Sequence, residues 1–269
     1  MDQRTIDAYL ARIGARRPAR PDLESLRHLQ ERHVLSVPFE NLGYHLDEPI
    51  HLDEKVLTKI VTEHRGGGCY EVNPALGLLL QALGYQVDLL PGRVYRGGAL
   101  GPPFCHLALR VHLEDEDWLV DAGFGRNSRR PLRIVEPAPQ SDPHGEYLLS
   151  PTQDGGGLEV RRNGEPLYQL DLHPARPADF GPTLWWWRTS PQSPFLQDLF
   201  CTLATPQGRV TLKGSTLVRL EEGRRVVEEL PDETAVLAAY KQHFGIHLDR
   251  APVAPLVAAD VTGPVGIQA

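Results

Sequence analysis

A single cysteine follows three glycines in the segment RGGGCYEVN, residues 65–73. Apolar residues recur after it at helical spacing, at Val72, Ala75, Leu76, Leu79, Leu80 and Leu83. This spacing predicts a helix that begins at or near Cys69 and ends at Gly84, a residue type common at helix C-termini. The positive end of a helix favours the thiolate, which is the nucleophilic form. Cys69 is therefore a candidate nucleophile, and free N–H groups at the helix start can hold an oxyanion.

A cysteine nucleophile needs a base to take its proton and a third group to orient that base. His106 begins a segment of alternating polar and apolar residues, and Asp121 ends the return strand before a glycine turn. With the hairpin turn centred on Asp115 and Glu116, His106 and Asp121 point to the same face of the sheet. In that register they are offset by four residues, roughly 13 Å at about 3.3 Å per residue. A bulge, a strong twist or a looser turn must then close the gap.

Each of these three residues also has a purely structural interpretation. A lone cysteine is commonly a small buried hydrophobic residue, and a histidine on a strand commonly packs in a core. An aspartate at a strand end commonly caps a turn. The combination of Cys69, His106 and Asp121 is more specific than any one of them, but spacing alone leaves both interpretations open.

The spacing of apolar residues, which predicts the elements that position these three residues, changes twice along the chain. Helical patterns cover residues 2–14, 23–34, 53–63 and 69–84, with a compact loop at 37–42. From Tyr85 the period changes to two, and short strands with Gly/Pro turns continue to about residue 190, which predicts an antiparallel sheet or barrel. Further short strands then precede a helix from Asp232 to His243. The pattern predicts an α+β fold that divides at 84/85 and 190/191.

The composition is that of an ordinary globular protein, with 269 residues of which 41% are apolar and 23% charged. A formal net charge of −7 argues against non-specific binding to nucleic acid. The N-terminus lacks the apolar core of a secretory signal, and no apolar run predicts a membrane span. Three widely spaced cysteines argue for a reducing cytoplasm and against a disulfide framework. They form no Cys-x-x-Cys pair, so we expect no metal.

The sequence resembles the arylamine N-acetyltransferases from the first helix to about residue 247. The resemblance rests on short motifs in the order and at the separations that are typical of the family. They are AYLARIG (8–14), VPFENL (37–42), RGGGCYEVN (65–73), HLAL (106–109), VDAGFG (120–125) and, more weakly, SPQSPF (190–195).

The resemblance implies that Cys69 is the nucleophile, His106 the catalytic histidine and Asp121 the orienting carboxylate. It also implies a papain-like core, and a buried structural ion pair between Arg12 and Glu40. The implied parts are an N-terminal helical bundle (1–84), a central antiparallel β-barrel (85–190) and a C-terminal α/β lid (191–269).

Three further residues take weaker roles from the resemblance. Phe124 is similar to the aromatic residue that lines the acceptor pocket, Val94 lies beside the pantetheine end of CoA, and Gly125 allows close approach of CoA. The sequence departs from the family beside the site. Gly68 stands where the family often has a bulky residue, and Cys105 stands where it often has threonine, so both bear on substrate preference.

The implied reaction is ping-pong acetyl transfer. The Cys69 thiolate takes the acetyl group from acetyl-CoA, the co-substrate, and an arylamine, arylhydrazine or arylhydroxylamine then attacks the acetyl-cysteine. One alternative is a Cys-His-Asp hydrolase or transglutaminase-like enzyme, which shares the triad. Another is a non-catalytic binding module with a degenerate triad. The sequence also leaves three points open. They are the choice among acetyl, propionyl and malonyl donors, the physiological amine and the oligomeric state.

Overall fold

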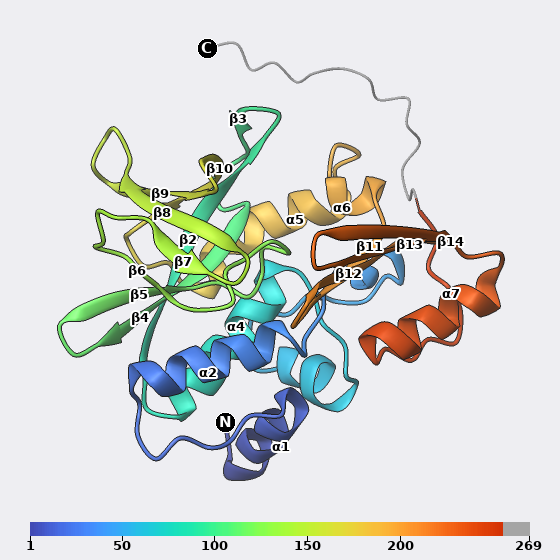
Figure 1. The fold of residues 1–269 in the computed structure, drawn as a ribbon, viewed down its shortest axis with the longest axis horizontal. Coiled ribbons are helices and arrows are strands. Elements are labelled where there is room, and N and C mark those ends of the chain that lie inside the picture. The colour runs from blue at the N-terminus through green and yellow to red at the C-terminus, as the bar shows by residue number, and fades with distance from the viewer. Residues whose placement is uncertain (255–269) are drawn as a thin grey trace.

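The computed structural model describes residues 1–254 and begins with helices (Figure 1). They are α1 (Gln3–Ile13), α2 (Leu23–Val34), α3 (Leu42–His45), a π-helical segment (Thr58–Thr62) and α4 (Cys69–Ala82). Asp2 and Asp22 cap α1 and α2 by accepting hydrogen bonds from backbone N–H groups of the first turns. The helix predicted over 53–63 is shortened to one π-helical segment. The helix predicted at Cys69 begins at that residue.

Residues 86–171 form an antiparallel sheet that curls into a nearly closed barrel. Its strands are β2 (Gln86–Arg96), β3 (Ala99–Leu100), β4 (His106–Leu113), β5 (Glu116–Val120), β6 (Leu132–Arg133), β7 (Gln140–Asp142), β8 (Gly145–Pro151), β9 (Gly157–Arg162) and β10 (Glu165–Asp171). The order is β6-β5-β4-β2-β10-β9-β8-β7, with β3 paired to β2. The Gln140 amide bridges the two end strands, because it accepts from Arg133 N at 2.7 Å and donates to Arg133 O at 2.9 Å.

The hairpin of β4 and β5 corrects the predicted register. Leu113 faces Glu116, so the turn holds only Glu114 and Asp115 and is two residues tighter than predicted. Leu109 faces Val120, and this register continued by one residue puts Asp121 opposite Ala108. The offset between His106 and Asp121 is therefore two residues, or about 7 Å along the strand. A tighter turn halves the predicted offset, whereas a bulge, a strong twist or a looser turn was expected to close it.

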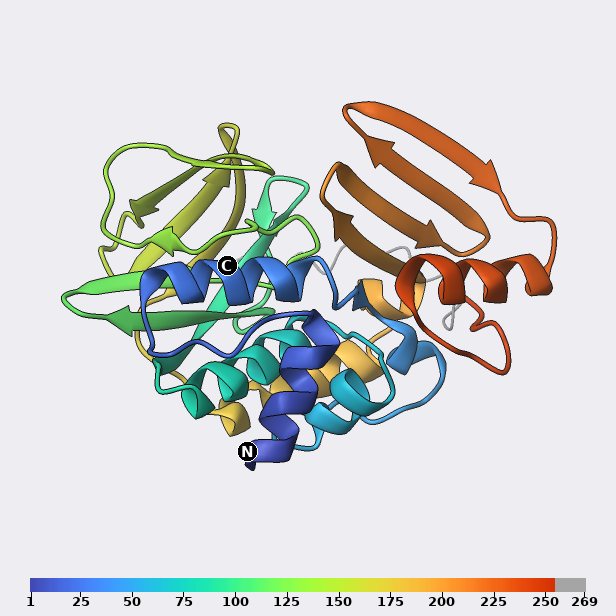
Figure 2. The same cartoon turned by 60° about the horizontal axis from the view of Figure 1, so that its bottom comes forward.

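The C-terminal region joins a second antiparallel sheet to helices that reach it from the barrel. It contains a 3-10 turn (Pro177–Phe180), α5 (Gly181–Thr189), α6 (Pro194–Gln197), β11 (Phe200–Thr205), β12 (Gly208–Lys213), β13 (Thr216–Glu221), β14 (Arg224–Glu229), α7 (Glu233–Ala239) and a π-helical segment (Tyr240–Phe244). Figure 2 shows this sheet beside the barrel, with α7 along one of its faces. The predicted α+β architecture of helices, barrel and C-terminal sheet region is confirmed.

The second sheet also takes in a strand from the N-terminal region. β1 (Phe39–Glu40) lies within the segment predicted as a loop, and it pairs with β11 at one edge of this sheet. Its other edge forms a bridge to Gly67. The helical core also contains Phe180 and Trp187, which lie beyond the barrel in sequence. The division at 84/85 and 190/191 stays a prediction, and residues 255–269 of the predicted lid lie outside the described residues.

Candidate active site

Cys69 is the first residue of α4 and directly follows the residue that caps this helix. Gly68 is the N-cap residue in extended conformation, and its N–H donates to the Glu71 carboxylate at 3.2 Å. The thiol is largely enclosed, with 6% of the residue exposed. The N–H groups of Cys69 and Tyr70, in the first turn, find no acceptor within the described part of the chain. They are the donors available to an oxyanion formed at Cys69.

The structure brings the three predicted catalytic residues together. His106 and Asp121 are both almost fully buried, and His106 Nε2 lies 2.9 Å from Asp121 Oδ2. The Cys69 side chain lies close enough to the imidazole to raise the pKa of His106. Because Nε2 is taken by Asp121, Nδ1 is the ring nitrogen left for the thiol. The arrangement of thiol, imidazole and carboxylate is that of a cysteine-nucleophile triad.

The charge state of this triad is governed by the carboxylate. Burial by itself lowers the pKa of His106, but the charge and hydrogen bond of Asp121, with a smaller contribution from Cys69, raise it to about 10. Burial raises the pKa of Asp121, but His106, Asn73 and the Gly123 N–H bring it below its ordinary value. At neutral pH the pair is therefore imidazolium and carboxylate. An imidazolium held by a carboxylate is the kind of partner that a cysteine nucleophile needs beside it.

Asn73, the last residue of the RGGGCYEVN motif, is a site residue that was not predicted from the sequence. Its amide donates to Asp121 Oδ1 at 3.0 Å and to Leu107 O at 2.6 Å, and its carbonyl accepts from Ala122 N at 2.8 Å. It thus ties α4 to β4 and to the loop after β5. The available signal was spacing: Asn73 lies four residues after Cys69 and so on the same face of the helix.

Gly123 is the point of closest approach between the Asp121 loop and the nucleophile. A Cβ built at Gly123 lies 2.6 Å from Cys69 Cα and 2.8 Å from Asn73 Nδ2. The first of these is backbone, so no side chain can move aside to make room. Position 68 is the opposite case, because a Cβ there meets nothing within 4 Å and the backbone φ is −76°.

We expect Gly123→Ala to lower both activity and stability. The added methyl pushes the loop away from α4, which lengthens the Asp121–His106–Cys69 contacts and destabilises the fold by about 1–3 kcal/mol. Urea unfolding and steady-state acetyl transfer measure the two effects. Gly68→Ala is the matched control on the other side of Cys69, and we expect it to fold and turn over. Equal behaviour of the two variants would contradict this account.

A buried charge network lies behind the nucleophile. Lys59 Nζ donates to Glu71 Oε1 at 2.7 Å, and Arg65 pairs with Glu40 at 3.1 Å. Burial lowers the pKa of Lys59, but Glu40 and Glu71 raise it above its ordinary value, so its charge is kept. The predicted ion pair between Arg12 and Glu40 is wrong. The Arg12 guanidinium donates to carbonyls of the π-helical segment and its C-terminal end, which leaves Glu40 to Arg65.

The three residues with weaker predicted roles lie around the histidine or beside its strand. The Phe124 ring is 5.4 Å from the His106 ring, and both contact Tyr168, at 4.9 and 4.6 Å between centroids. Val94 on β2 is the register partner of Tyr168. Gly125 has φ +74°, and a Cβ there would lie 2.9 Å from the Phe39 ring. Tyr168 was missed because β10 follows more than sixty residues after β2.

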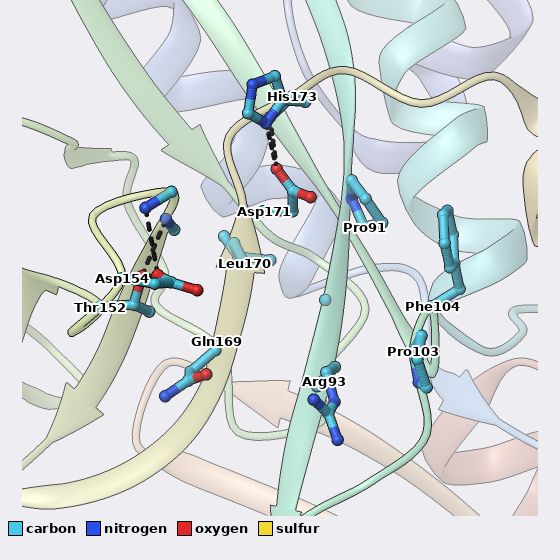
Figure 3. Close-up of a pocket in the computed structure, with 13 residues that line it drawn as sticks. Pro91, Arg93, Pro103, Phe104, Thr152, Asp154, Gln169, Leu170, Asp171 and His173 are labelled. Carbon is cyan, nitrogen blue, oxygen red and sulfur yellow. Dashed lines mark hydrogen bonds and ion pairs between the residues drawn. The ribbon is translucent and has the colours of Figure 1, made fainter.

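A separate pocket of about 290 Å³ opens beside β2 and β10 (Figure 3). Its lining includes Arg93, Phe104, Asp154 and Gln169, but none of the three predicted catalytic residues. The Asp171–His173 pair at its edge is largely exposed to solvent.

Within residues 1–254 there is no cluster of three or more side chains suited to a metal, and no helix long and apolar enough to cross a membrane.

The chain is similar to known proteins in both sequence and structure. A family model described as N-acetyltransferase matches residues 22–253. An arylamine N-acetyltransferase of Escherichia coli (strain K12) is 33% identical over 253 residues, 91% of this chain and 90% of that protein. The structure of arylamine N-acetyltransferase from Salmonella typhimurium has TM-score 0.83 at 33% identity, covering 91% and 92% of the two chains. That of Mycobacterium marinum in complex with CoA has TM-score 0.82 at 31% identity, covering 90% and 92%.

The family model gives the class, an N-acetyltransferase, over most of the chain. The relatives and the solved structures narrow it: the chain belongs to the arylamine N-acetyltransferase family. It is therefore an acetyl-CoA-dependent acyltransferase, and the family resemblance predicted from its motifs is confirmed.

Proposed function

We propose that this protein transfers an acetyl group from acetyl-CoA to the nitrogen of an arylamine through an acetyl thioester on Cys69. The observation that supports this most is one buried imidazole that lies 2.9 Å from the Asp121 carboxylate and close to the Cys69 thiol at the start of α4. Arylhydrazines and arylhydroxylamines are acceptors of the same kind, because each offers a nucleophilic nitrogen or oxygen on an aromatic ring.

In the first half-reaction the Cys69 thiolate attacks the thioester carbonyl of acetyl-CoA. The N–H groups of Cys69 and Tyr70 stabilise the oxyanion of the tetrahedral intermediate. The carbon–sulfur bond to CoA then breaks, and CoA leaves as a thiol with the proton of the His106 imidazolium. The products are acetyl-Cys69 and a neutral imidazole. The Mycobacterium marinum relative, solved in complex with CoA, supports CoA as the carrier.

In the second half-reaction the arylamine nitrogen attacks acetyl-Cys69, and the neutral His106 accepts the proton that this nitrogen loses. The Cys69 thiolate leaves as the amide forms, and the resting ion pair is restored. Asp121 stabilises the imidazolium in this step, and Asn73 holds Asp121 by donating to its second oxygen at 3.0 Å. We propose that Phe124 lines the acceptor pocket, that Val94 lies beside the pantetheine arm, and that Gly125 permits the approach of CoA.

A hydrolase or transglutaminase-like enzyme could use the same triad, with water or another amine as acceptor. Membership of an acetyl-transferring family favours the arylamine reaction. The small-molecule partners are then acetyl-CoA and the amine. A net charge of −7 supports the absence of a nucleic-acid partner. Three free cysteines support a cytoplasmic location.

Intact-protein mass spectrometry tests the proposal. We expect incubation with acetyl-CoA to add the mass of one acetyl group, which peptide mapping assigns to Cys69. Addition of an arylamine is expected to return the original mass with formation of the N-acetyl product. An acetyl group on another residue, or an acetyl-enzyme that reacts with water as fast as with the amine, would overturn the proposal.

A further inference from the structure

Strand β14 has an outer edge that pairs with no other strand of the described chain. The second sheet runs in the order β1-β11-β12-β13-β14, so β14 is its edge strand on the side opposite β1, and its six residues are all exposed. Leu230 N, just after the strand, donates to Ser215 O at 2.9 Å. Backbone groups alternate between the two sides of a strand, so the outward N–H and C=O groups are those of Arg225, Val227 and Glu229. Such a free edge is a template for pairing with a further strand.

The sequence of β14 is complementary to itself. It reads RRVVEE, with positive charges at one end and negative charges at the other. When two copies pair antiparallel about a two-fold axis at Val227, Arg225 of each copy faces Glu229 of the other. Opposite charges that face each other across strands stabilise a sheet, and like charges destabilise it. This register also pairs every outward N–H and C=O group of the three residues with one in the second copy.

The apolar side chains of β14 fit the same register. Val227 is 46% exposed and pairs with Val218 of β13, so joining two copies continues a row of valines across both sheets. Val218 alternates with Leu217, which is buried in the same core cluster as Val236 of α7. The row of valines therefore lies on the face of the sheet that α7 does not cover (Figure 2), and this helix does not block the approach of a second copy.

Charged residues on an edge strand commonly serve to prevent pairing. Charges of one sign would have that effect in β14, because a second copy would be repelled. The observed order has the opposite effect, because reversal of the strand brings each arginine end to a glutamate end. The Thr216 hydroxyl donates to Glu229 at 2.9 Å, which holds this carboxylate on the same face as Arg225 and Val227.

We propose that the protein forms a two-fold symmetric dimer in which β14 pairs antiparallel with β14 of a second copy, so that the two C-terminal sheets become one. The inference does not depend on the function proposed above, because β14 contains none of the residues given a catalytic or binding role. One short strand from each copy makes an interface below the about 1,200 Å² that stable complexes bury. The dimer is therefore expected to be weak and to form at high protein concentration.

Sedimentation equilibrium of the full chain tests the inference. We expect the mean mass to rise from that of one chain towards that of two between about 1 and 500 µM protein. The dimer is expected to weaken at about 1 M salt, because the charges that pair are exposed. A chain that remains monomeric over the whole concentration range would overturn the inference.

Two charge reversals test the register. Arg225→Glu places like charges opposite each other at both ends of the pairing, and so does Glu229→Arg. Each variant alone is expected to weaken the dimer by more than about tenfold. An equimolar mixture of the two variants is expected to associate, because every introduced charge then faces one of opposite sign. Both positions are exposed, so we expect the fold to be kept.

Arg224→Glu is the matched control. It makes the same change of charge on the same strand, but on the α7 face, where the proposed register puts Leu230 of the second copy opposite. We expect it to weaken the dimer by less than about threefold. Failure of the mixed variants to associate, or equal effects of Arg225→Glu and Arg224→Glu, would overturn the proposed pairing.

Discussion

Replacement of Cys69 by serine is expected to reduce arylamine acetylation on the order of 10⁴-fold or more, because members of a catalytic triad act as a unit. Serine fits the space of the thiol, which is enclosed at the start of α4, so we expect the fold to be kept. A hydroxyl beside an imidazolium does not ionise as a thiol does, and the first half-reaction therefore stops. Turnover with acetyl-CoA and an arylamine measures the loss, and circular dichroism checks the fold.

Cys105→Ala is the control for this experiment. Cys105 precedes His106 and is also buried, and its Sγ accepts a hydrogen bond from Val94 N at 3.2 Å. Burial raises the pKa of Cys105, so it stays a thiol at neutral pH. We expect this variant to keep most of its activity and still to take up one acetyl group. Activity that survives in Cys69→Ser but is lost in Cys105→Ala would show that Cys105, and not Cys69, is the nucleophile.

Replacement of Asp121 by asparagine is expected to cost about 10³–10⁴-fold in kcat while changing the shape of the site very little. The charge of Asp121 offsets the effect of burial on His106, so its removal lowers the pKa of His106 from about 10. The imidazole is then neutral in the resting enzyme and cannot give a proton to departing CoA. An NMR titration of His106 in both proteins measures the shift directly.

The same pKa has a consequence for stability. His106 titrates near its ordinary value of 6.5 when unfolded and near 10 when folded, so the folded state holds the proton more tightly. Its contribution to the free energy of unfolding is full below pH 6.5 and is lost as the pH rises towards 10. Denaturant unfolding across this range is expected to show a decline that is smaller in Asp121→Asn. A steeper decline in the variant would contradict the assignment of Asp121 as the stabilising charge.

The sequence predicted those features that depend on local pattern. Apolar spacing after Cys69 gave the helix that presents the thiol, and alternation gave the strand that carries His106. The motifs gave the family, which the relatives confirm. In the hairpin, the prediction that His106 and Asp121 point to the same face of the sheet was right, because side chains alternate along a strand. The register was wrong by two residues because four acidic residues in a row offer no signal for where the turn lies.

Features that depend on distant segments could not be read from the sequence. Tyr168 reaches His106 only because β10 pairs with β2, and a two-residue strand such as β1 has no detectable period. The partner of Glu40 was wrong for a related reason. The backbone carbonyls that bind Arg12 leave no trace in the residue pattern, whereas Arg65 comes to Glu40 through the bridge between Phe39 and Gly67.

The two edges of β1 have a consequence for any attempt to recombine this protein with its relatives. One edge is bonded to β11 and the other to the glycine loop at Gly67, two residues before the nucleophile. β11, β1 and the glycine loop at Gly67 thus lie side by side, and they link the last third of the chain to the residues just before the thiol. A chimera with a foreign C-terminal half has to keep the pairing of β11 with Phe39 and Glu40, or the graft will tilt the glycine loop that precedes Cys69.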